Sequence, residues 1–568
     1  MKQRLFYLAI AFAFSCLGTA QTFNWGKSFG GISEDTVRNM VVDSQGNCYI
    51  TGYFAKTAIF QEGQNPISLS TDIFGFSDIY VAKINAEGVV LWAKSFGGPD
   101  HDYGNGIALD AQGNILITGI FTQTAMFNPG GEGGELTSNG FQDLFVLKLN
   151  QDGNFIWVKG FGSPNYEESV SVATDATGNV YLTGYFFSSI DFDPSENEYI
   201  MNVTSDSSNG FIMKMNAAGE FVWAKQIGAS GASYSGSVKV AQNGEIYVLG
   251  AFTGATDLNP AANGEFLVES AGKDIYLLRL DATGNFLNAY TSAVLNESST
   301  TEAPRFTTDA LGNIFIIGNF MGTVNFDPMQ NGSGFTLSTD GFLYNSFVLK
   351  ISPEGTPAWV KKITGNGMTL TYDIAVSAQN NILISGYFTG SAEFGTINIA
   401  QQSPNYMDSF FAKMNANGEF QSANSFAGTG GADGHEIELG PENSIYLSSA
   451  YHETVDLNPL EGELTMAAAG NEGYADIYLI KLTDEVLGLP ENHTASNTVI
   501  YPNPAGNFIQ IAGKENFAGQ GYQLYDISGR QVLKGTFDHQ QKIILNDLSK
   551  GSYILVVGDR HRFKLIKN

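Results

Sequence analysis

The chain has 568 residues, of which 66 are glycine and 12% are aromatic, and its formal net charge is −28. The first 20 residues carry +2 and residues 498–568 carry +4, so residues 21–497 carry −34. A charge of this sign argues against nucleic acids and anionic membranes as partners of the middle region. Glycine-rich turns between runs of aromatic and β-branched residues favour many short strands over long helices.

The N-terminal residues 1–20 predict a secretory signal peptide. Lys2 and Arg4 form its basic start, residues 5–17 its apolar stretch, and residues 18–20 a small-residue cleavage site. Neither this stretch nor any later one is long and apolar enough for a membrane-spanning helix. We therefore expect an exported protein with no transmembrane segment once the signal is removed.

One motif recurs along residues 21–483 with a nearly constant period. It is a short strand with a central glycine, as in Thr-Gly-Tyr-Phe, and successive copies are 67, 65, 66, 68, 68 and 63 residues apart. The central positions are Gly52, Gly119, Gly184, Gly250, Gly318, Gly386 and, in a degenerate last copy, Ser449. A fixed long period predicts a repeat architecture in which each unit packs on its neighbours.

The unit over residues 96–161 displays the strand pattern of the repeat. Apolar runs at 106–110, 115–121, 144–149 and 155–161 are separated by two tight Asp/Asn–Gly turns and one long loop. Four antiparallel strands in each of seven units predict an all-β fold, a seven-bladed β-propeller.

The N-terminal strand is expected to complete the last blade. The repeat ends after a third strand, at Leu482, whereas Trp25 matches the tryptophan of the fourth strands in other copies. Residues 23–29 would therefore supply the missing strand and close the ring, which removes the exposed ends of a linear array.

These repeats resemble a known family. The stretch Phe-Gly-Gly…Asp-Tyr-Gly…Ile-Ala-Leu-Asp…Gly-Asn-Ile…Thr-Gly-Ile-Phe, residues 96–121, is similar to the bacterial SBBP repeat, and the resemblance covers about residues 22–483. It implies a seven-bladed β-propeller of secreted proteins. The family has no general catalytic residues, so the resemblance transfers none to this chain.

The strand rhythm is lost over residues 484–497, which we interpret as a linker. Short alternating strands then predict a small β-sandwich over residues 498–568. This tail resembles the type A C-terminal sorting domain of the type IX secretion system, an alternative being an ordinary adhesion sandwich. The residues that carry the resemblance are Tyr501, Pro502, Asn503, Pro504, Gly529, Arg530, Gly551 and Tyr553. It implies the type IX machinery as partner, removal of the tail, and release or surface attachment.

Two acidic sets could bind calcium. Asp35, Asp102 and Glu167 stand at equivalent places before the first strands of three units, and Asp191 and Asp193 form an alternating Asp-Phe-Asp-Pro sequence. Carboxylates at such places also accept hydrogen bonds from backbone N–H groups in turns, and we favour that interpretation. No complete twelve-residue calcium loop is present, and no cofactor is expected.

Catalytic motifs such as His-Glu-x-x-His and Gly-x-Ser-x-Gly are absent, so the sequence predicts a non-enzymatic protein. The loops between second and third strands vary in length, with 22 to 27 residues from the central position of the second strand to the start of the third. They should lie on one face, the expected place for recognition. We expect a binding or adhesion scaffold for an extracellular protein or glycan. The alternatives are a polysaccharide-acting enzyme, marked by a convergent His/Asp/Glu/Tyr cluster on the innermost strands, and a structural matrix or gliding-associated protein.

Overall fold

The computed structural model describes residues 21–484 and 499–567 with short gaps, so the predicted signal peptide and residues 485–497 of the predicted linker lie outside the described residues. The gaps are residues 62–65, 72–74, 196, 204–206, 229, 262–264, 330–332, 340, 404–405, 427, 433–435, 461–462, 471–472, 502–504, 513–516, 527–530, 547 and 558–560. Gln21–Asp484 form one compact unit, and the C-terminal residues belong to a second.

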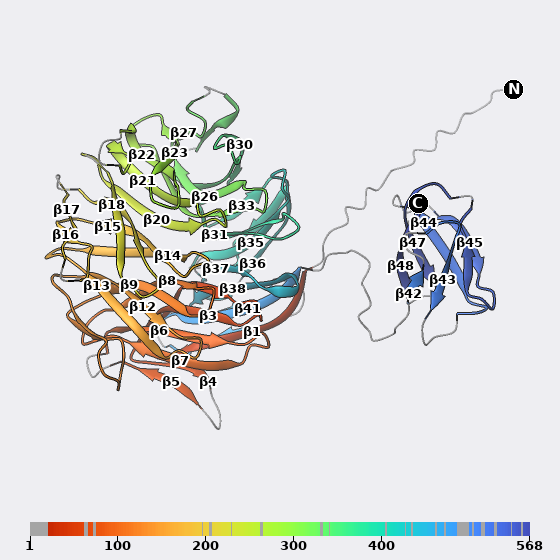
Figure 1. The fold of residues 1–568 in the computed structure, drawn as a ribbon, viewed down its shortest axis with the longest axis horizontal. Helices are drawn as coiled ribbons and strands as arrows, with labels where there is room; N and C mark the ends of the chain where they lie inside the picture. Colours follow the sequence, from red (N-terminus) through yellow and green to blue (C-terminus); the bar gives the residue numbers. More distant parts are fainter. Residues whose placement is uncertain are drawn as a thin grey trace. The chain divides into compact units, whose positions relative to one another are not determined.

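Four-stranded antiparallel sheets follow one another along Gln21–Asp484 (Figure 1), and in each the strands pair in the order first, second, third, fourth. The first three are β2 (Asp35–Val42), β3 (Cys48–Ala55), β6 (Ser77–Ile84) and β7 (Val90–Phe96); β8 (Tyr103–Leu109), β9 (Ile115–Phe121), β12 (Asp143–Leu149) and β13 (Phe155–Phe161); and β14 (Glu167–Thr174), β15 (Val180–Phe186), β18 (Asn209–Met215) and β19 (Phe221–Ile227).

The following sheets repeat the same order, and one bridge between β22 and β25 links two of them. They are β20 (Ser233–Val240), β21 (Ile246–Asp257), β22 (Leu267–Leu280) and β23 (Phe286–Thr291); β25 (Thr300–Thr308), β26 (Ile314–Met321), β29 (Asn345–Ile351) and β30 (Pro357–Ile363); and β31 (Thr369–Val376), β32 (Ile382–Phe388), β35 (Asp408–Met414) and β36 (Phe420–Phe426).

The last sheet consists of β37 (Glu436–Leu439), β38 (Ser444–Tyr451), β41 (Asp476–Asp484) and, as its fourth strand, β1 (Gln21–Gly31) (Figure 1). β1 runs antiparallel to β41 from the pair Gln21–Asp484 to the pair Phe29–Ile477, which is the pairing that the sequence predicts. Our assignment of Asp484 to the linker is wrong, because this residue ends β41 and its buried carboxylate lies 2.6 Å from Lys413 Nζ.

Much of the long connection between second and third strands is itself paired, and so is a short segment between β23 and β25. The sequence analysis treated these segments as loop. The extra strands are β4 (Thr57–Gln61), β5 (Ile67–Ser70), β10 (Thr124–Met126), β11 (Glu135–Thr137), β16 (Ile190–Asp191), β17 (Ile200–Met201), β24 (Ala293–Val294), β27 (Thr323–Asn325), β28 (Thr336–Ser338), β33 (Ser391–Phe394), β34 (Ile397–Ala400), β39 (Thr454–Asp456) and β40 (Thr465–Ala467). In the described part of the chain the helical elements are two short 3₁₀ turns, η1 (Ser333–Phe335) and η2 (Pro441–Asn443).

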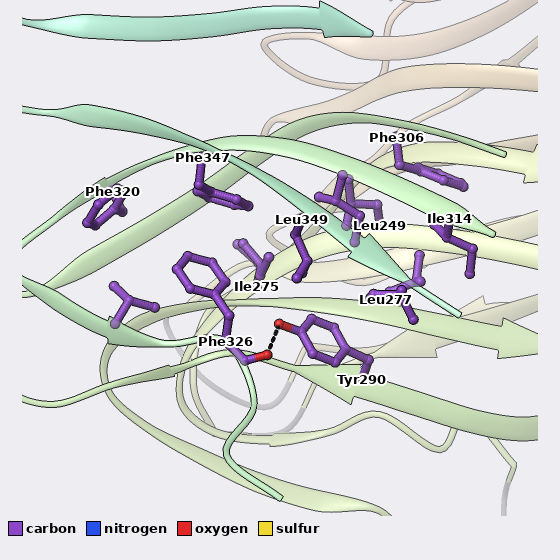
Figure 2. Close-up of a cluster of buried hydrophobic side chains, with 14 of the residues drawn as sticks. Leu249, Ile275, Leu277, Tyr290, Phe306, Ile314, Phe320, Phe326, Phe347 and Leu349 are labelled. Atoms are coloured by element: carbon purple, nitrogen blue, oxygen red, sulfur yellow. Dashed lines mark hydrogen bonds between the residues drawn. The ribbon is translucent and has the colours of Figure 1, made fainter. Parts of the chain in front are cut away.

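Apolar side chains fill the space between neighbouring sheets. Figure 2 shows one such cluster, in which Leu249, Ile275 and Leu277 of one sheet pack against Phe347 and Leu349 of the next. The strands alternate, so every second side chain faces one neighbour and the others face the opposite neighbour. One polar atom in this layer, the Tyr290 hydroxyl, donates to the Phe326 carbonyl over 2.9 Å (Figure 2).

Tryptophans of the fourth strands pack on glycines of the next sheet. Gly88, in the turn between β6 and β7, has a φ of +78°, and a Cβ there would lie 3.0 Å from the Trp25 indole of β1. The indole Nε1 also donates to Ala86 O in the same turn, over 3.0 Å. The packing of indole on glycine recurs in the pairs Trp92–Gly153, Trp157–Gly219, Trp223–Gly284 and Trp359–Gly418, whereas the indole N–H groups of Trp92 and Trp157 have no hydrogen-bond partner among the residues that the structure describes.

Basic residues of the third strands make a second repeated contact between sheets. Lys148 Nζ donates to Ala217 O over 3.1 Å, and Lys481 Nζ donates to Ala86 O over 3.0 Å. The second of these joins β41 of the last sheet to the turn before β7 of the first. The contacts between the last and first sheets are therefore of the same kind as those between sheets adjacent in sequence.

The C-terminal unit has two antiparallel sheets that enclose one buried apolar cluster. They are β42 (Val499–Tyr501), β43 (Phe508–Ala512) and β46 (Lys542–Ile544); and β45 (Gln531–Thr536), β44 (Gly521–Asp526), β47 (Gly551–Val557) and β48 (His561–Lys567). Tyr501 ends β42, and Gly551 and Tyr553 lie in β47, where the Tyr553 hydroxyl donates to Ser549 O over 2.8 Å. The predicted sorting residues Pro502, Asn503, Pro504, Gly529 and Arg530 lie outside the described residues.

The contact between Trp25 and Gly88 gives a test of how the last and first sheets are joined. We expect Gly88→Ala to lower the stability of the protein by about 1–3 kcal/mol more than Gly113→Ala. Both glycines have a φ of +78°, but at Gly113 the nearest heavy atom to a Cβ would be 3.9 Å away. Urea unfolding of both variants measures the difference. Equal losses would mean that the Trp25 contact adds nothing beyond the backbone strain.

Candidate functional site

The first strands of all the sheets in Gln21–Asp484 meet around one cavity of about 320 Å³, here called the inner cavity. Its walls are largely small or apolar, with a few charged side chains among them. Residues of β2, β8, β14, β20, β25, β31 and β37 line it, including Asn39, Ile107, Ser171, Lys239, Arg305, Asp373, Glu436 and Glu438. Side chains from the whole length of the unit therefore converge there.

An ion pair and its hydrogen bonds cross the inner cavity. The Arg305 guanidinium lies 3.4 Å from Glu436 Oε1, and Asn39 Nδ2 donates to Glu436 Oε2 over 3.2 Å. Asp373 accepts a 2.8 Å hydrogen bond from the Ile437 backbone N–H. These contacts connect β25, β31, β37 and β2, so buried charges help to fix the positions of the first strands.

The carboxyls of this group have strongly perturbed pKa values. Burial raises the pKa of Glu436 from its ordinary value, against the opposing effect of its ion-pair partner Arg305 and with the Asp373 charge adding to the rise. Burial likewise raises the pKa of Glu438 to about 7, with Lys239 opposing and Asp373 adding. A carboxyl with a pKa near 7 can carry a proton at neutral pH, as a general acid must.

A second cavity, of about 360 Å³, is here called the tyrosine cavity. Its lining includes Tyr185, Tyr234, Tyr372 and Tyr387 together with Glu168, Glu302 and Arg305. Arg305 lines the inner cavity as well, so its side chain lies where the two cavities approach each other. Glu168 and Tyr234 are the second residues of β14 and β20, so this cavity lies toward the end at which the first strands begin.

Charged groups of the tyrosine cavity differ in their partners. Lys273 Nζ lies 2.7 Å from Glu302 Oε1 and 4.9 Å from the centroid of the Tyr234 ring. Glu168 accepts hydrogen bonds from the Tyr185 hydroxyl and from Asn105 Nδ2. One carboxylate of this cavity is thus paired with a cation, whereas the other is held by neutral donors.

Exposed apolar side chains gather in the connections at this same end of the sheets, here called the long-loop face. Phe141 is 64% exposed and stacks on Tyr166, with ring centroids 5.1 Å apart and planes at 7°. Further exposed apolar residues in these connections are Ile32, Phe76, Phe187, Leu295, Met329, Phe342, Leu343 and Tyr474. In the described turns at the opposite end of the sheets, the exposed large apolar side chains are those of Val89 and Leu311.

The structure does not bring Asp35, Asp102 and Glu167 together as one site: Asp102 and Glu167 bind loops of their own sheets, whereas the Asp35 carboxyl is buried without a hydrogen-bond partner among the described residues. Asp102 accepts hydrogen bonds from the backbone N–H groups of Gly98 and Thr122 at 2.7 and 2.9 Å. Glu167 accepts one from the N–H of Ser163 at 2.9 Å. Burial, with the nearby Asp476 charge, raises the pKa of Asp35 to about 8, and burial raises that of Asp102 to about 7.

Asp191 and Asp193 are likewise engaged in local turns. Asp191 Oδ1 accepts from the N–H groups of Asp193 and Tyr199 at 3.0 and 2.8 Å, and Asp193 Oδ1 accepts from Ser195 N–H at 3.0 Å. Within the described parts of the chain, no group of three or more His, Cys, Asp or Glu side chains has an arrangement suited to a metal ion.

Sequence reasoning missed Glu168, Arg305 and Glu436, although a signal for two of them was present. Arg305 and Glu436 each pair with the residue just before the repeated central position, Ile317 and Ser448. Four other copies have small or neutral residues at this place, namely Asn39, Gly106, Ser171 and Ser237, and the sixth copy has Asp373, just before the pair Ile374–Ile384. Aligning the first strands copy by copy would therefore have isolated three charged residues, Arg305, Asp373 and Glu436.

The C-terminal residues 499–568 match the family of secretion system C-terminal sorting domains. A WD repeat-containing protein of Acanthamoeba polyphaga mimivirus is 22% identical over 444 residues, which is 66% of this chain and 32% of that protein. The regulatory protein FlaEY of Caulobacter vibrioides is 25% identical over 178 residues, covering 30% of this chain and 18% of its own length. The chain thus spans less than a third of either relative.

Several solved structures resemble the chain at low identity. A protein from Bacteroides caccae is 10% identical with a TM-score of 0.29, covering 61% of this chain and 89% of its own. Synechocystis apocarotenoid oxygenase is 12% identical with a TM-score of 0.34, covering 80% and 92%. The extracellular domain of a one-component system of B. thetaiotaomicron is 10% identical with a TM-score of 0.17, covering 95% and 99%. Scores in this range carry no argument about function.

The sorting domain determines where the protein goes. A domain of this family directs export through the type IX secretion system to the cell surface or the extracellular space. In the portion of the chain that the structure describes, no helix has the length and apolar character needed to cross a membrane. The chain is therefore a repetitive, all-β protein that carries a C-terminal sorting domain for type IX export.

Proposed function

We propose that Gln21–Asp484 form a closed, seven-bladed β-propeller of the SBBP-repeat type. Support comes from the repeated strand order, from the pairing of β1 with β41, and from the Trp25 and Lys481 contacts with the turn before β7. In a propeller, the first strands of the blades surround a central channel. The inner cavity and the tyrosine cavity would then be two parts of that channel.

We further propose that this exported propeller is a binding or adhesion protein and that its long-loop face recognises an extracellular protein or glycan. The observation that carries this proposal is the concentration of exposed aromatic and aliphatic side chains in the connections of one face. Exposed apolar patches of this kind mark interaction sites more often than they mark inert surface. The tyrosine cavity lies toward the same end of the sheets and could bind one group of the ligand specifically.

A second candidate is an extracellular polysaccharide-acting enzyme. It is favoured by Asp373, Glu436 and Glu438, which form the kind of convergent acidic cluster that the sequence analysis named as its mark. Hydrolases of this kind need one carboxyl that donates a proton and one carboxylate that attacks or activates water. The strong engagement of Glu436 with Arg305 and Asn39 makes a structural role for the cluster our first choice.

For the calcium candidates, we infer that the carboxyls stabilise loops. Asp102 and Glu167 already accept backbone hydrogen bonds, and a pKa of about 8 keeps Asp35 mostly protonated at pH 7. A protonated carboxyl is a poor ligand for calcium, which prefers charged oxygen donors.

The binding proposal is tested with glycan and protein arrays. We expect Phe141→Ala and Tyr166→Ala to reduce ligand binding about tenfold or more, because each removes half of an exposed aromatic stack. Both side chains are at least half exposed, so the unfolding free energy should change by less than about 0.5 kcal/mol. Leu311→Ala, at the opposite face and 71% exposed, is the matched control. Equal binding by all three variants would exclude this face.

The enzyme alternative has its own test. If the inner cavity is catalytic, Glu438→Gln should abolish cleavage of a susceptible polysaccharide, and the native protein should release sugars or unsaturated ends from at least one polymer in a panel. We expect no release by the native protein. Cleavage that disappears in Glu438→Gln would replace the binding proposal with this one.

Asp35 gives a test by pH and by calcium. Its folded-state pKa is raised from an ordinary 3.8 to about 8, so the folded state binds more protons than the unfolded state between these values. Stability should therefore fall as the pH rises from about 4 to 8, and Asp35→Asn should fall less over the same range. Thermal melts of both proteins measure this. A rise in the midpoint with calcium that is lost in Asp35→Asn would restore the metal hypothesis.

A further inference from the structure

The charge balance of the tyrosine cavity is uneven among its described residues. Arg305 is paired with Glu436, and Lys273 with Glu302. Glu168, in contrast, accepts hydrogen bonds from two neutral groups. They are the Tyr185 hydroxyl and the Asn105 side-chain amide, whose Nδ2 lies 3.3 Å from Glu168 Oε1. The cavity therefore has a carboxylate whose charge no recorded ion pair balances.

Tyrosine side chains line the same cavity as this carboxylate, and one of them, Tyr185, donates a hydrogen bond to it. Tyr185, Tyr234, Tyr372 and Tyr387 line the same 360 Å³ as Glu168. Faces of tyrosine rings attract cations, and this cavity already uses that attraction within the protein, since Lys273 Nζ lies 4.9 Å from the Tyr234 ring centroid. Several rings around one negative charge form the arrangement that recognises ammonium groups.

Long-range electrostatics act in the same direction. Residues 21–497 carry a formal charge of −34, so the mean potential around this part of the chain is negative and attracts cations. A neutral sugar could accept and donate hydrogen bonds in the tyrosine cavity, but it would leave the charge of Glu168 without a counterion when it displaces water.

We propose that the tyrosine cavity binds an organic ammonium group, held by the Glu168 carboxylate and the surrounding tyrosine rings. This inference rests on the proposed binding function and gives it a ligand class. Such a group could be a quaternary ammonium, a lysine side chain or a protonated amino sugar, and 360 Å³ is enough for any of them. The shared chemistry is a positive nitrogen at the end of an extracellular ligand.

The test uses two probes of the same shape that differ in charge. Isothermal titration of the native protein is made with choline and with its neutral isostere 3,3-dimethylbutan-1-ol. We expect choline to bind at least about tenfold more tightly. Glucosamine and Nα-acetyl-lysine amide, whose side-chain ammonium is free, are titrated next. They distinguish an amino sugar from a lysine side chain as the natural source.

Variants locate the site. Glu168→Gln keeps one oxygen acceptor, which can serve Tyr185, and Asn105 Nδ2 still donates to Ser169 O over 3.2 Å. The fold should therefore be retained while choline affinity falls about tenfold or more. Tyr234→Phe should retain most of the affinity, because the ring remains, whereas Tyr234→Ala should lose it. Glu87→Gln removes an exposed carboxylate from a turn at the opposite face and is the matched control, expected to bind choline as the native protein does.

Two results would overturn the inference: equal binding of choline and its neutral isostere, or unchanged choline affinity in Glu168→Gln. Neither result would touch the broader binding proposal, because that one is measured with Phe141→Ala and Tyr166→Ala on the loops. Conversely, loss of array binding in the loop variants with choline binding intact would separate the two sites.

Discussion

The fold of Gln21–Asp484 depends on how each sheet contacts the next, since no single sheet of four strands can bury both of its faces alone. The repeated contact joins a fourth-strand tryptophan to a glycine in the following turn, as Trp25 does with Gly88. The glycine has two reasons to be there. Its positive φ shapes the tight turn, and its missing Cβ leaves room for the indole. One residue thus fixes both the turn and the distance between neighbouring sheets.

Packing of this kind leaves a centre that no sheet fills. The first strands meet there, and their side chains face one another across the inner cavity and the tyrosine cavity. An apolar layer lies between neighbouring sheets throughout the unit, whereas the charged residues at the centre differ from copy to copy. The proposed propeller therefore separates stability from specificity. The apolar layers between sheets supply stability, and single residues at the centre, such as Arg305 and Glu168, supply specificity.

This separation explains how far the sequence could lead. The period and the strands could be predicted because the same motif recurs in every repeat. The pairing of the N-terminal strand with the last repeat could be predicted because that repeat lacks a fourth strand of its own. The Asx turns could be predicted too, since an aspartate before a tight turn commonly accepts hydrogen bonds from the backbone N–H groups of that turn. Glu168, Arg305 and Glu436 each occur in one copy, and alternation within a strand does not say which face is the centre. Their meaning depends on partners far away in the chain, as when Asn39 meets Glu436.

The pairing of β1 with β41 has a consequence for how the protein is made. The two strands are far apart in the chain: the Thr483 hydroxyl donates to Asn24 Oδ1, and these residues are separated by 459 positions. The end of β1 pairs early in the chain, since Gly30 and Gly31 pair with β4, but its residues 21–29 have no partner strand until β41 has been synthesised. During that interval the first strand and the edge it later covers are both open to other strands. A product that ends before β41 would therefore leave residues 21–29 of β1 unpaired, and an unpaired strand is prone to aggregation.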